Sequence, residues 1–267
     1  MSSISTPGTA LVTGASTGIG SIYAQRLAQR GYDVILVARD HQRLVNLANK
    51  IAAKTGHNAQ VLVADLTVKA DLKRVEERLR SDKSITALVN NAGFGGAAKL
   101  IDSNIDEMEN MIQLNVTALT RLTSAVLPGF LQRSKGLIIN IASVVALSPE
   151  LLNGVYSGTK AFVLNLTQSL HHEVKDKGIR VQAVLPGATR TPFWDRAELP
   201  VDNLPEEKVM TAEEMVDASL AGLDQGELIT IPSLPNLADW EEFEAARKAL
   251  GPNLTHKHSA ARYGVQV

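Results

Sequence analysis

The sequence of 267 residues predicts an α/β fold, a doubly wound parallel sheet of seven strands with helices on both faces. Short apolar runs alternate along the chain with longer stretches whose apolar residues recur at helical spacing, the order of consecutive strand–helix–strand units. The runs are apolar throughout and do not alternate with polar residues, as expected for strands that are covered on both faces. Because no repeat, low-complexity tract or linker interrupts this pattern, we expect one domain over residues 1–267.

Each strand is predicted by a short apolar run, often rich in β-branched residues. In chain order the seven runs are residues 9–13, 34–38, 61–64, 85–90, 137–142, 179–185 and 228–231. Gly14 follows the first run, Asn91 follows the fourth and Pro186 interrupts the chain after the sixth, and such residues commonly end strands. The carboxyl ends of parallel strands lie at one edge of a sheet, so these loops should share a single rim, where open α/β sheets bind ligands.

The helices are predicted between these runs. The first, residues 18–30, has apolar residues at helical spacing and stops before Gly31, a common C-terminal signal. The remaining helices are predicted at residues 40–55, 69–81, 104–133, 154–177, 211–223 and 238–250. Pro128 should kink or shorten the helix that contains it. Residues 188–210 contain three prolines and are predicted to be irregular, and the tail from Gly251 is predicted to be loosely structured.

Composition and charge disfavour several classes of function. Lysine and arginine number 27 against 28 acidic residues, a formal net charge of −1, which disfavours a nucleic-acid partner and a polybasic membrane-binding surface. Cysteine is absent, so disulfides, thiolate metal sites and a cysteine nucleophile are excluded. We find neither a secretory signal nor an apolar run of about 18 residues that could cross a membrane. We therefore expect a cytoplasmic protein that binds no metal, nucleic acid or membrane.

A glycine-rich loop, residues 13–20 with the sequence TGASTGIG, joins the first predicted strand to the first predicted helix. Glycine permits a tight turn and a close approach of the backbone to a phosphate, and the helix N-terminus adds N–H groups and a positive dipole end. This strand–loop–helix context is what a dinucleotide site requires. The spacing is T-G-x-x-x-G-x-G and differs from the common G-x-G-x-x-G fingerprint.

Two other interpretations of this loop stay open. The letters G-A-S-T-G also match the G-x-S-x-G turn that presents a nucleophilic serine, here Ser16, in serine hydrolases. That turn normally follows several strands, whereas eight residues precede the first strand here. The loop could also be a turn that binds no ligand.

Tyr156 and Lys160 lie four residues apart in a predicted helix, so their side chains should share one face. A tyrosine hydroxyl, with an ordinary pKa of about 10, is a poor base at neutral pH, but a neighbouring ammonium favours its ionised form. The pair is therefore a candidate acid–base unit. Ser143 directly follows the strand predicted at residues 137–142, which brings it to the same rim as the glycine loop.

Taken together, these motifs resemble the short-chain dehydrogenase/reductase family, in its single-domain NAD(P)-dependent branch with a Rossmann fold. The resemblance spans about residues 9–191. It rests on the loop at 13–20, on Asn90-Asn91-Ala92-Gly93, Asn115, Ser143, Tyr156 with Lys160, and Pro186-Gly187-x-x-x-Thr191. It implies an oxidoreductase that interconverts a ketone or aldehyde and an alcohol by hydride transfer, with the cofactor carrying the hydride.

The resemblance implies a role for each matching residue. Tyr156 would be the general acid–base, Ser143 would orient the substrate oxygen, and Lys160 would lower the pKa of Tyr156 and hold the nicotinamide ribose. Asn115 would anchor a water that links Lys160 to solvent, although by itself it could be an exposed helix position. The residues expected to bind the cofactor are Gly14, Ser16, Thr17, Gly18, Ile19, Gly20, Arg39, Asp65, Leu66, Asn91, Ala92, Gly93, Tyr156, Lys160, Pro186, Gly187 and Thr191.

The end of the second strand favours NADP(H) over NAD. An acidic residue there would bind the ribose 2′-OH of NAD, but that position is Ala38, and Arg39, which follows it, suits a 2′-phosphate. Asp40 is interpreted as the N-cap of the next helix. Thr17 stands where many NADP-preferring members carry a basic residue. Asp65, just past the third strand, could likewise be an N-cap instead of an adenine-binding residue.

We expect an apolar carbonyl or alcohol substrate and a homodimer or homotetramer. The substrate would lie against Val144, Val145, Leu152 and the variable loop at 188–210, in which Phe193 and Trp194 could instead pack locally. Subunits would pair through the helices at 104–133 and 156–177. The main alternative is a non-catalytic NADP(H)-binding regulator on the same fold. Such proteins usually lack the Tyr or Lys, and this chain retains Tyr156 and Lys160.

Overall fold

The computed structural model describes residues 7–197 and 199–265. The chain divides into two compact units, the first ending at Pro232 and the second beginning at Ser233, and each is described by itself. The expectation of one domain over residues 1–267 stays a prediction. All the residues expected at the site belong to the first unit.

The first unit is built on a seven-stranded sheet in which every neighbouring pair is parallel. From one edge to the other its strands are β3 (Ala59–Val63), β2 (Asp33–Ala38), β1 (Thr9–Thr13), β4 (Ile85–Asn90), β5 (Gly136–Ile141), β6 (Ile179–Val184) and β9 (Ile229–Thr230). The order runs outward in both directions from β1 and β4. This is the topological switch point at which such sheets bind ligands.

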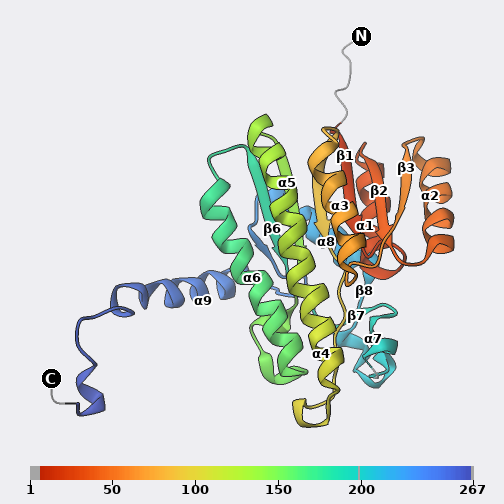
Figure 1. Ribbon diagram of the computed structural model, residues 1–267. Coiled ribbons are helices and arrows are strands. Elements are labelled where there is room, and N and C mark those ends of the chain that lie inside the picture. Colours follow the sequence, from red (N-terminus) through yellow and green to blue (C-terminus); the bar gives the residue numbers. More distant parts are fainter. Residues whose placement is uncertain (1–6, 198, 266–267) are drawn as a thin grey trace. The chain divides into compact units, whose positions relative to one another are not determined.

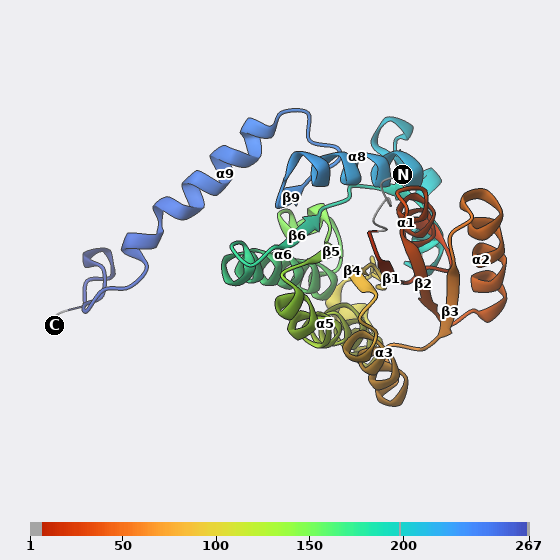
Figure 2. The ribbon, with the colours of Figure 1, turned by 90° about the horizontal axis from the view of Figure 1, so that it is seen from above.

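Helices cover both faces of the sheet, as Figures 1 and 2 show. One face carries α1 (Gly18–Gln29), α2 (His41–Thr55) and α8 (Ala212–Gln225), and the other carries α3 (Lys69–Ser81), α5 (Leu119–Arg133) and α6 (Gly154–Val174). Val12 and Leu36 belong to the first buried cluster, whereas Leu11 and Ile35 belong to the second. Successive strand residues point to opposite faces, so both faces must be apolar. The predicted fold class is confirmed.

The long helix predicted at residues 104–133 is not one regular α-helix. It consists of α4 (Ile105–Ile112), a π-helical segment (Gln113–Ala118) and α5. Asn115 lies in the π-helical segment, and such segments recur at functional sites. Pro128 lies inside α5, which continues to Arg133, so the expected shortening does not occur.

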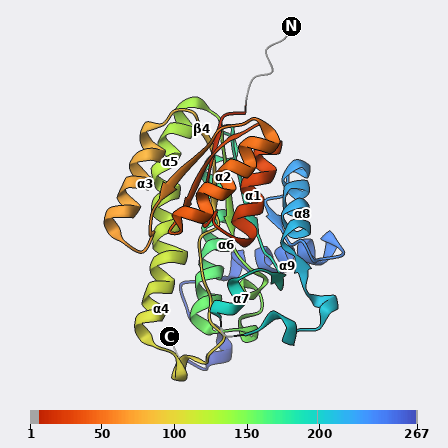
Figure 3. The same ribbon diagram turned by 90° about the vertical axis from the view of Figure 1, so that its right-hand side faces the viewer.

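Residues 188–210 are more regular than predicted. A two-stranded parallel sheet joins β7 (Thr189–Arg190) to β8 (Met210–Thr211), and between them lie α7 (Phe193–Arg196) and two short 3-10 turns at Val201–Asn203 and Glu206–Lys208. In Figures 1 and 3, α7 lies at the same end of the unit as α4. The carboxyl ends of the strands of the seven-stranded sheet point toward this end.

The second unit contains α9 (Leu237–Ala249) and short 3-10 turns at Gly251–Asn253 and Ala261–Tyr263. The helix predicted at 238–250 is thus present with bounds shifted by one residue. Over residues 233–265 no side chain is buried. In the part of the chain that the structure describes, no helix combines the length and the apolar character needed to cross a bilayer.

Candidate active site

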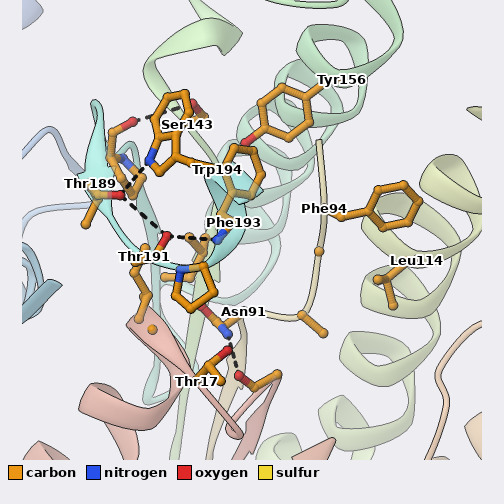
Figure 4. A pocket seen from close by; sticks show the side chains of 18 of the residues that line it. Thr17, Asn91, Phe94, Leu114, Ser143, Tyr156, Thr189, Thr191, Phe193 and Trp194 are labelled. Carbon is orange, nitrogen blue, oxygen red and sulfur yellow. Dashed lines mark hydrogen bonds between the residues drawn. The ribbon is translucent and has the colours of Figure 1, made fainter. Parts of the chain in front are cut away.

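A cavity of about 780 Å³ lies at the carboxyl ends of the sheet strands. Loops that follow six strands line it, through Gly14 after β1, Arg39 after β2, Asp65 after β3, Asn91 after β4, Ser143 after β5 and Gly187 after β6. Figure 4 shows part of this cavity, with Thr17 and Asn91 toward one end and Ser143 and Tyr156 toward the other. The expectation that these loops share one rim is confirmed.

The predicted site residues all line this cavity except two. Gly20 is buried behind the glycine loop, where an added Cβ would overlap the Gly14 carbonyl and the Asn91 amide. Asn115 lies behind Gly93: a Cβ at Gly93 would be 2.9 Å from Asn115 Oδ1 and 3.6 Å from Lys160 Nζ. Both residues therefore shape the cavity wall from behind.

The glycine loop needs its glycines for conformation and for space. Gly14 and Gly18 have positive φ values of 65° and 53°, a region that other residues rarely adopt. A Cβ on Gly14 would lie 2.7 Å from Asn91 Nδ2, and one on Gly18 would lie 3.1 Å from Thr191 Cγ2. The loop is thus packed closely against the segments after β4 and β6.

The loop leaves the N-terminus of α1 open to the cavity. Thr17 occupies the N-cap position without capping the helix through its side chain, and the first turn has no acidic residue. Ser16, Thr17, Gly18 and Ile19 line the cavity. Uncapped N–H groups at a positive dipole end form a site for a phosphate.

Asn91 ties this loop to the segment after β4. Its Nδ2 donates to the Thr13 carbonyl at 2.9 Å, and Thr13 Oγ1 accepts the backbone N–H groups of Asn91 and Ala92, both at 3.0 Å. These bonds fix two neighbouring loops at the switch point of the sheet. Their backbone is therefore held in place before any ligand binds.

The far end of the cavity carries two guanidinium groups. Arg39 is largely exposed, with Nη1 3.7 Å from Asp65 Oδ2. Asp40 is the N-cap of α2, as expected, and accepts the Arg43 N–H at 3.0 Å. Arg43 also lines the cavity, with Nε 3.3 Å from Asp40 Oδ2. Arg43 lies within the helix and belongs to no motif, so it was not among the predicted site residues; its place three residues after a capping aspartate was the available signal.

Asp65 does not cap a helix, which corrects the alternative interpretation of this residue. The N-cap of α3 is Val68. Asp65 Oδ1 accepts the N–H of Thr67 at 2.9 Å and its hydroxyl at 2.7 Å, which closes a local turn. Asp65 and Leu66 therefore line the cavity wall beyond β3.

Ser143, Tyr156 and Lys160 come together from β5 and α6. Asn153 caps α6 by accepting the N–H groups of Val155 and Tyr156, which starts the helix just before Tyr156. The Lys160 ammonium lies 5.7 Å from the centre of the Tyr156 ring and donates to the Ile141 carbonyl at 2.8 Å. All three side chains are buried and line the cavity.

Burial dominates the protonation of this group. It raises the pKa of Tyr156 well above its ordinary value, and a hydrogen bond with Ser143 opposes that rise. Burial lowers the pKa of Lys160 to about 8. In this structure burial therefore outweighs the lowering of the Tyr156 pKa that was expected from Lys160. A phenol that stays protonated at neutral pH can act as a proton donor.

Asn115 is buried, which corrects the alternative of an exposed helix position. Its Oδ1 accepts the Phe94 N–H at 3.1 Å, and its Nδ2 donates to the Phe94 carbonyl at 2.9 Å and to Thr159 Oγ1 at 3.1 Å. The π-helical segment thus ties the loop after β4 to α6. That α6 turn also carries Tyr156 and Lys160.

The end of the cavity near Tyr156 is apolar. Phe193 lies against Tyr156, with ring centres 5.7 Å apart, and Trp194 is buried, with its indole N–H donating to the Thr189 carbonyl at 2.7 Å. The other apolar lining residues are Phe94, Leu114, Val144, Val145, Leu151, Leu152, Leu199 and Leu204. Phe94 and Leu114 were missed because neither belongs to a motif. In the described ranges, no group of three His, Asp or Glu side chains could hold a metal ion.

Comparisons with known proteins agree with this geometry. The family described as short chain dehydrogenase matches residues 8–200. A short-chain dehydrogenase from Sphingobium yanoikuyae, solved in complex with NADPH, is 48% identical, with 95% of this chain and 98% of that chain covered and a TM-score of 0.92. A bulky-bulky ketone specific alcohol dehydrogenase from Comamonas testosteroni is 46% identical, with coverages of 96% and 98% and a TM-score of 0.88.

An uncharacterized oxidoreductase from Staphylococcus epidermidis is 36% identical over 220 residues, which are 81% of this chain and 90% of that protein. The family match covers more than half of the chain and includes the glycine loop, Ser143, Tyr156 and Lys160. It therefore disfavours the serine hydrolase alternative, and the retained Tyr156 and Lys160 disfavour the non-catalytic one. The chain belongs to the short-chain dehydrogenase family and is an oxidoreductase of that family.

Proposed function

We propose that the protein is an NADP(H)-dependent oxidoreductase that interconverts an apolar ketone and the corresponding secondary alcohol, with Tyr156 as the acid–base residue. One observation carries the proposal. The buried side chains of Tyr156, Ser143 and Lys160 line one end of a cavity whose other end is formed by the glycine loop. A proton donor and a dinucleotide cradle thus face the same space.

The cavity has the groups that a nicotinamide dinucleotide phosphate requires. The open N-terminus of α1 would bind its central phosphates, and Arg39 and Arg43 would bind the 2′-phosphate. Asp65 and Leu66 would hold the adenine end. The nicotinamide end would lie against the Asn91–Gly93 segment, Lys160, Pro186, Gly187 and Thr191. The NADPH bound to the Sphingobium yanoikuyae relative supports this assignment.

A bound nicotinamide supplies or accepts the hydride. In reduction, Tyr156 donates its proton to the substrate oxygen, and in oxidation it takes that proton back. Ser143 orients this oxygen through its hydroxyl, which is held near the Pro186 carbonyl and the Val145 N–H. The Lys160 ammonium lies 5.7 Å from the Tyr156 ring centre and would stabilise the phenolate that forms as the proton leaves.

The substrate class follows from the wall around Tyr156. Phe193, Trp194 and a set of leucines and valines line this end, so apolar substituents on the carbonyl would be buried there. The bulky ketones named for the Comamonas testosteroni relative support the proposal of large apolar substituents. Aldehydes with similar substituents would enter the same space.

The test combines a substrate screen with a cofactor comparison. The oxidation of NADPH and of NADH is followed with a panel of aliphatic and aromatic ketones and aldehydes. Arg39→Ala should weaken NADPH binding about tenfold or more, because a charge-assisted bond to the phosphate is lost, and should leave NADH binding nearly unchanged. Arg26→Ala is the control, since Arg26 pairs with Asp217 and does not line the cavity.

Two outcomes would contradict the proposal. NADPH binding without turnover of any carbonyl in the panel would favour the non-catalytic alternative. Equal effects of Arg39→Ala on NADPH and NADH would remove the assignment of the 2′-phosphate to Arg39.

A further inference from the structure

Gly95 has no motif role, yet two aromatic rings meet at the place where its side chain would be. A Cβ on Gly95 would lie 2.6 Å from Phe193 Cζ and 3.0 Å from both Cδ2 and Cε2 of Tyr156. The first distance is shorter than real carbon–carbon contacts allow, so the Phe193 ring would have to move. The neighbouring Gly96 differs, because its Cβ would meet just Met111 Cε, at an ordinary 3.8 Å.

The Phe193 ring is held in this place from its own side. Trp194, the next residue, is buried and bonded to the Thr189 carbonyl at 2.7 Å, and the Phe193 carbonyl accepts the Ala197 N–H at 3.1 Å. Thr189 belongs to β7, which pairs with β8. The backbone that carries Phe193 is therefore anchored, so a side chain at position 95 would displace the ring and not the helix.

The Phe193 ring lies beside the tyrosine that would bind the substrate oxygen. Figure 4 shows Phe193 beside the hydroxyl end of Tyr156, and the two ring centres are 5.7 Å apart with an interplanar angle of 43°. A substrate oxygen bonded to Ser143 and Tyr156 would direct one of its two substituents toward this ring. The space on that side depends on how far the ring retreats into the niche at Gly95.

We propose that Gly95 and Phe193 together limit how large one substituent of the ketone can be. Gly95, which has no side chain, leaves the space that the Phe193 ring occupies. This inference rests on the proposed function and specifies its substrate class further. Because Gly95 does not touch the cavity, it acts on specificity through the ring. The wild-type protein should then accept a larger alkyl group on that side than a protein with a side chain at position 95.

The experiment compares two ketones that differ in one substituent. With NADPH, kcat/KM is measured for acetophenone and for butyrophenone, and the ratio of butyrophenone to acetophenone is the readout. Phe193→Ala should raise this ratio and Gly95→Ala should lower it, each by about tenfold, the range expected for apolar groups in a pocket. Gly96→Ala is the matched control and should leave the ratio within about twofold.

The double variant Gly95→Ala/Phe193→Ala shows whether the effect of Gly95→Ala acts through the Phe193 ring or through Tyr156. Its ratio should match that of Phe193→Ala, because the ring that the new methyl group would displace is gone. If Gly95→Ala lowers the ratio equally with and without Phe193, the effect runs through Tyr156 and the proposal fails. The proposal also fails if Phe193→Ala reduces both ketones with the wild-type ratio. This comparison does not need Gly95→Ala, so it tests the proposal even if that variant does not fold.

The proposed function and this inference fail in different ways. If the wild-type protein oxidises NADPH with neither of these ketones nor with any other carbonyl in the screen, the proposed function is wrong. If the wild-type protein reduces both ketones and the three single variants share its ratio, the proposed function stands and the specificity assignment is wrong.

Discussion

Lys160 carries a buried ammonium that suits its expected role beside Tyr156 but costs folding stability. Its ammonium is buried and bonded to a single carbonyl, that of Ile141, and burial lowers its pKa to about 8 from an ordinary value of 10.5. Removing a charge from water without a counter-charge costs free energy. The buried lysine is placed to act on Tyr156, and its buried charge should lower the stability of the folded protein.

Lys160→Met should stabilise the cofactor-free protein at pH 7. Between pH 8 and 10.5 the unfolded chain binds more protons than the folded one, so the wild-type stability rises with pH in that window. Below pH 8 the full penalty is present, at most about 3 kcal/mol, and the Ile141 carbonyl left without its donor offsets part of it. We expect a net gain of roughly 1–2 kcal/mol at pH 7, measured by urea unfolding.

The gain should shrink as the pH approaches 10, because the folded wild-type lysine is then neutral and no longer buries a charge, although the unfolded chain still binds most of its proton. A gain of the same size at pH 7 and pH 10 would show that charge burial is not its cause. A loss of stability at pH 7 would contradict the account.

At the scale of elements, the regular helices and strands could be predicted and the irregular ones could not. The sheet strands and the caps of α2 and α6 depend on local signals, such as apolar runs and Asp40 or Asn153 before a helix. The π-helical segment at Gln113–Ala118 leaves the apolar spacing almost unchanged, so periodicity misses it. β7 and β8 have two residues each, and they form because they pair with each other across about twenty residues of sequence.

The contact between α3 and α5 contains a buried carboxylate, which the helical spacing of apolar residues does not predict. Glu76 occupies an inward position of α3 beside Val75, and its carboxylate is paired with Arg80 at 2.9 Å and with Arg121 of α5. Burial acts to raise the pKa of Glu76, but hydrogen bonds from Arg121 and Arg80 outweigh it, so the pKa lies below its ordinary value. The carboxylate thus links the two helices.

Glu76→Ala should lower the free energy of unfolding by about 1–2 kcal/mol, because the hydrogen bonds from Arg80 and Arg121 are lost while both guanidinium groups can still be hydrated. Glu77→Ala, on the exposed side of the same helix, should change it by less than about 0.5 kcal/mol. Urea unfolding of both variants at pH 7 is the measurement. Equal effects at the two positions would show that the ion pairs contribute nothing specific.

At the scale of the whole molecule, the predicted motifs come together because they follow strands of one sheet. Gly14, Asn91 and Ser143 are far apart in sequence, and topology alone brings them to one cavity. The roles of Phe94 and Gly95 could not be predicted, since they depend on distances between loops, whereas the place of Arg43 after the capping Asp40 was a usable signal. The size of that cavity and the place of the Phe193 ring are properties of packing and carry no sequence signature.

We propose a homodimer or homotetramer that pairs through α4, α5 and α6, where Ile105, Ile112 and Phe162 are exposed. Sedimentation equilibrium should give two or four times the mass of the chain. Introducing a charge with Ile112→Asp and Phe162→Asp should lower that mass, because burying an unpaired carboxylate in an apolar interface is costly. Val63→Asp, on the edge strand β3, is the control. A monomeric wild-type protein would contradict this proposal.

Tyr156→Phe tests most directly whether Tyr156 moves the proton during carbonyl reduction. The variant keeps the ring and removes the hydroxyl, so NADPH binding, followed by fluorescence, should stay within about twofold while kcat for ketone reduction falls by about 10²–10⁴-fold. Tyr32→Phe, a half-buried tyrosine outside the cavity, should retain full activity. Reduction by Tyr156→Phe at a rate close to that of the wild-type protein would contradict the account.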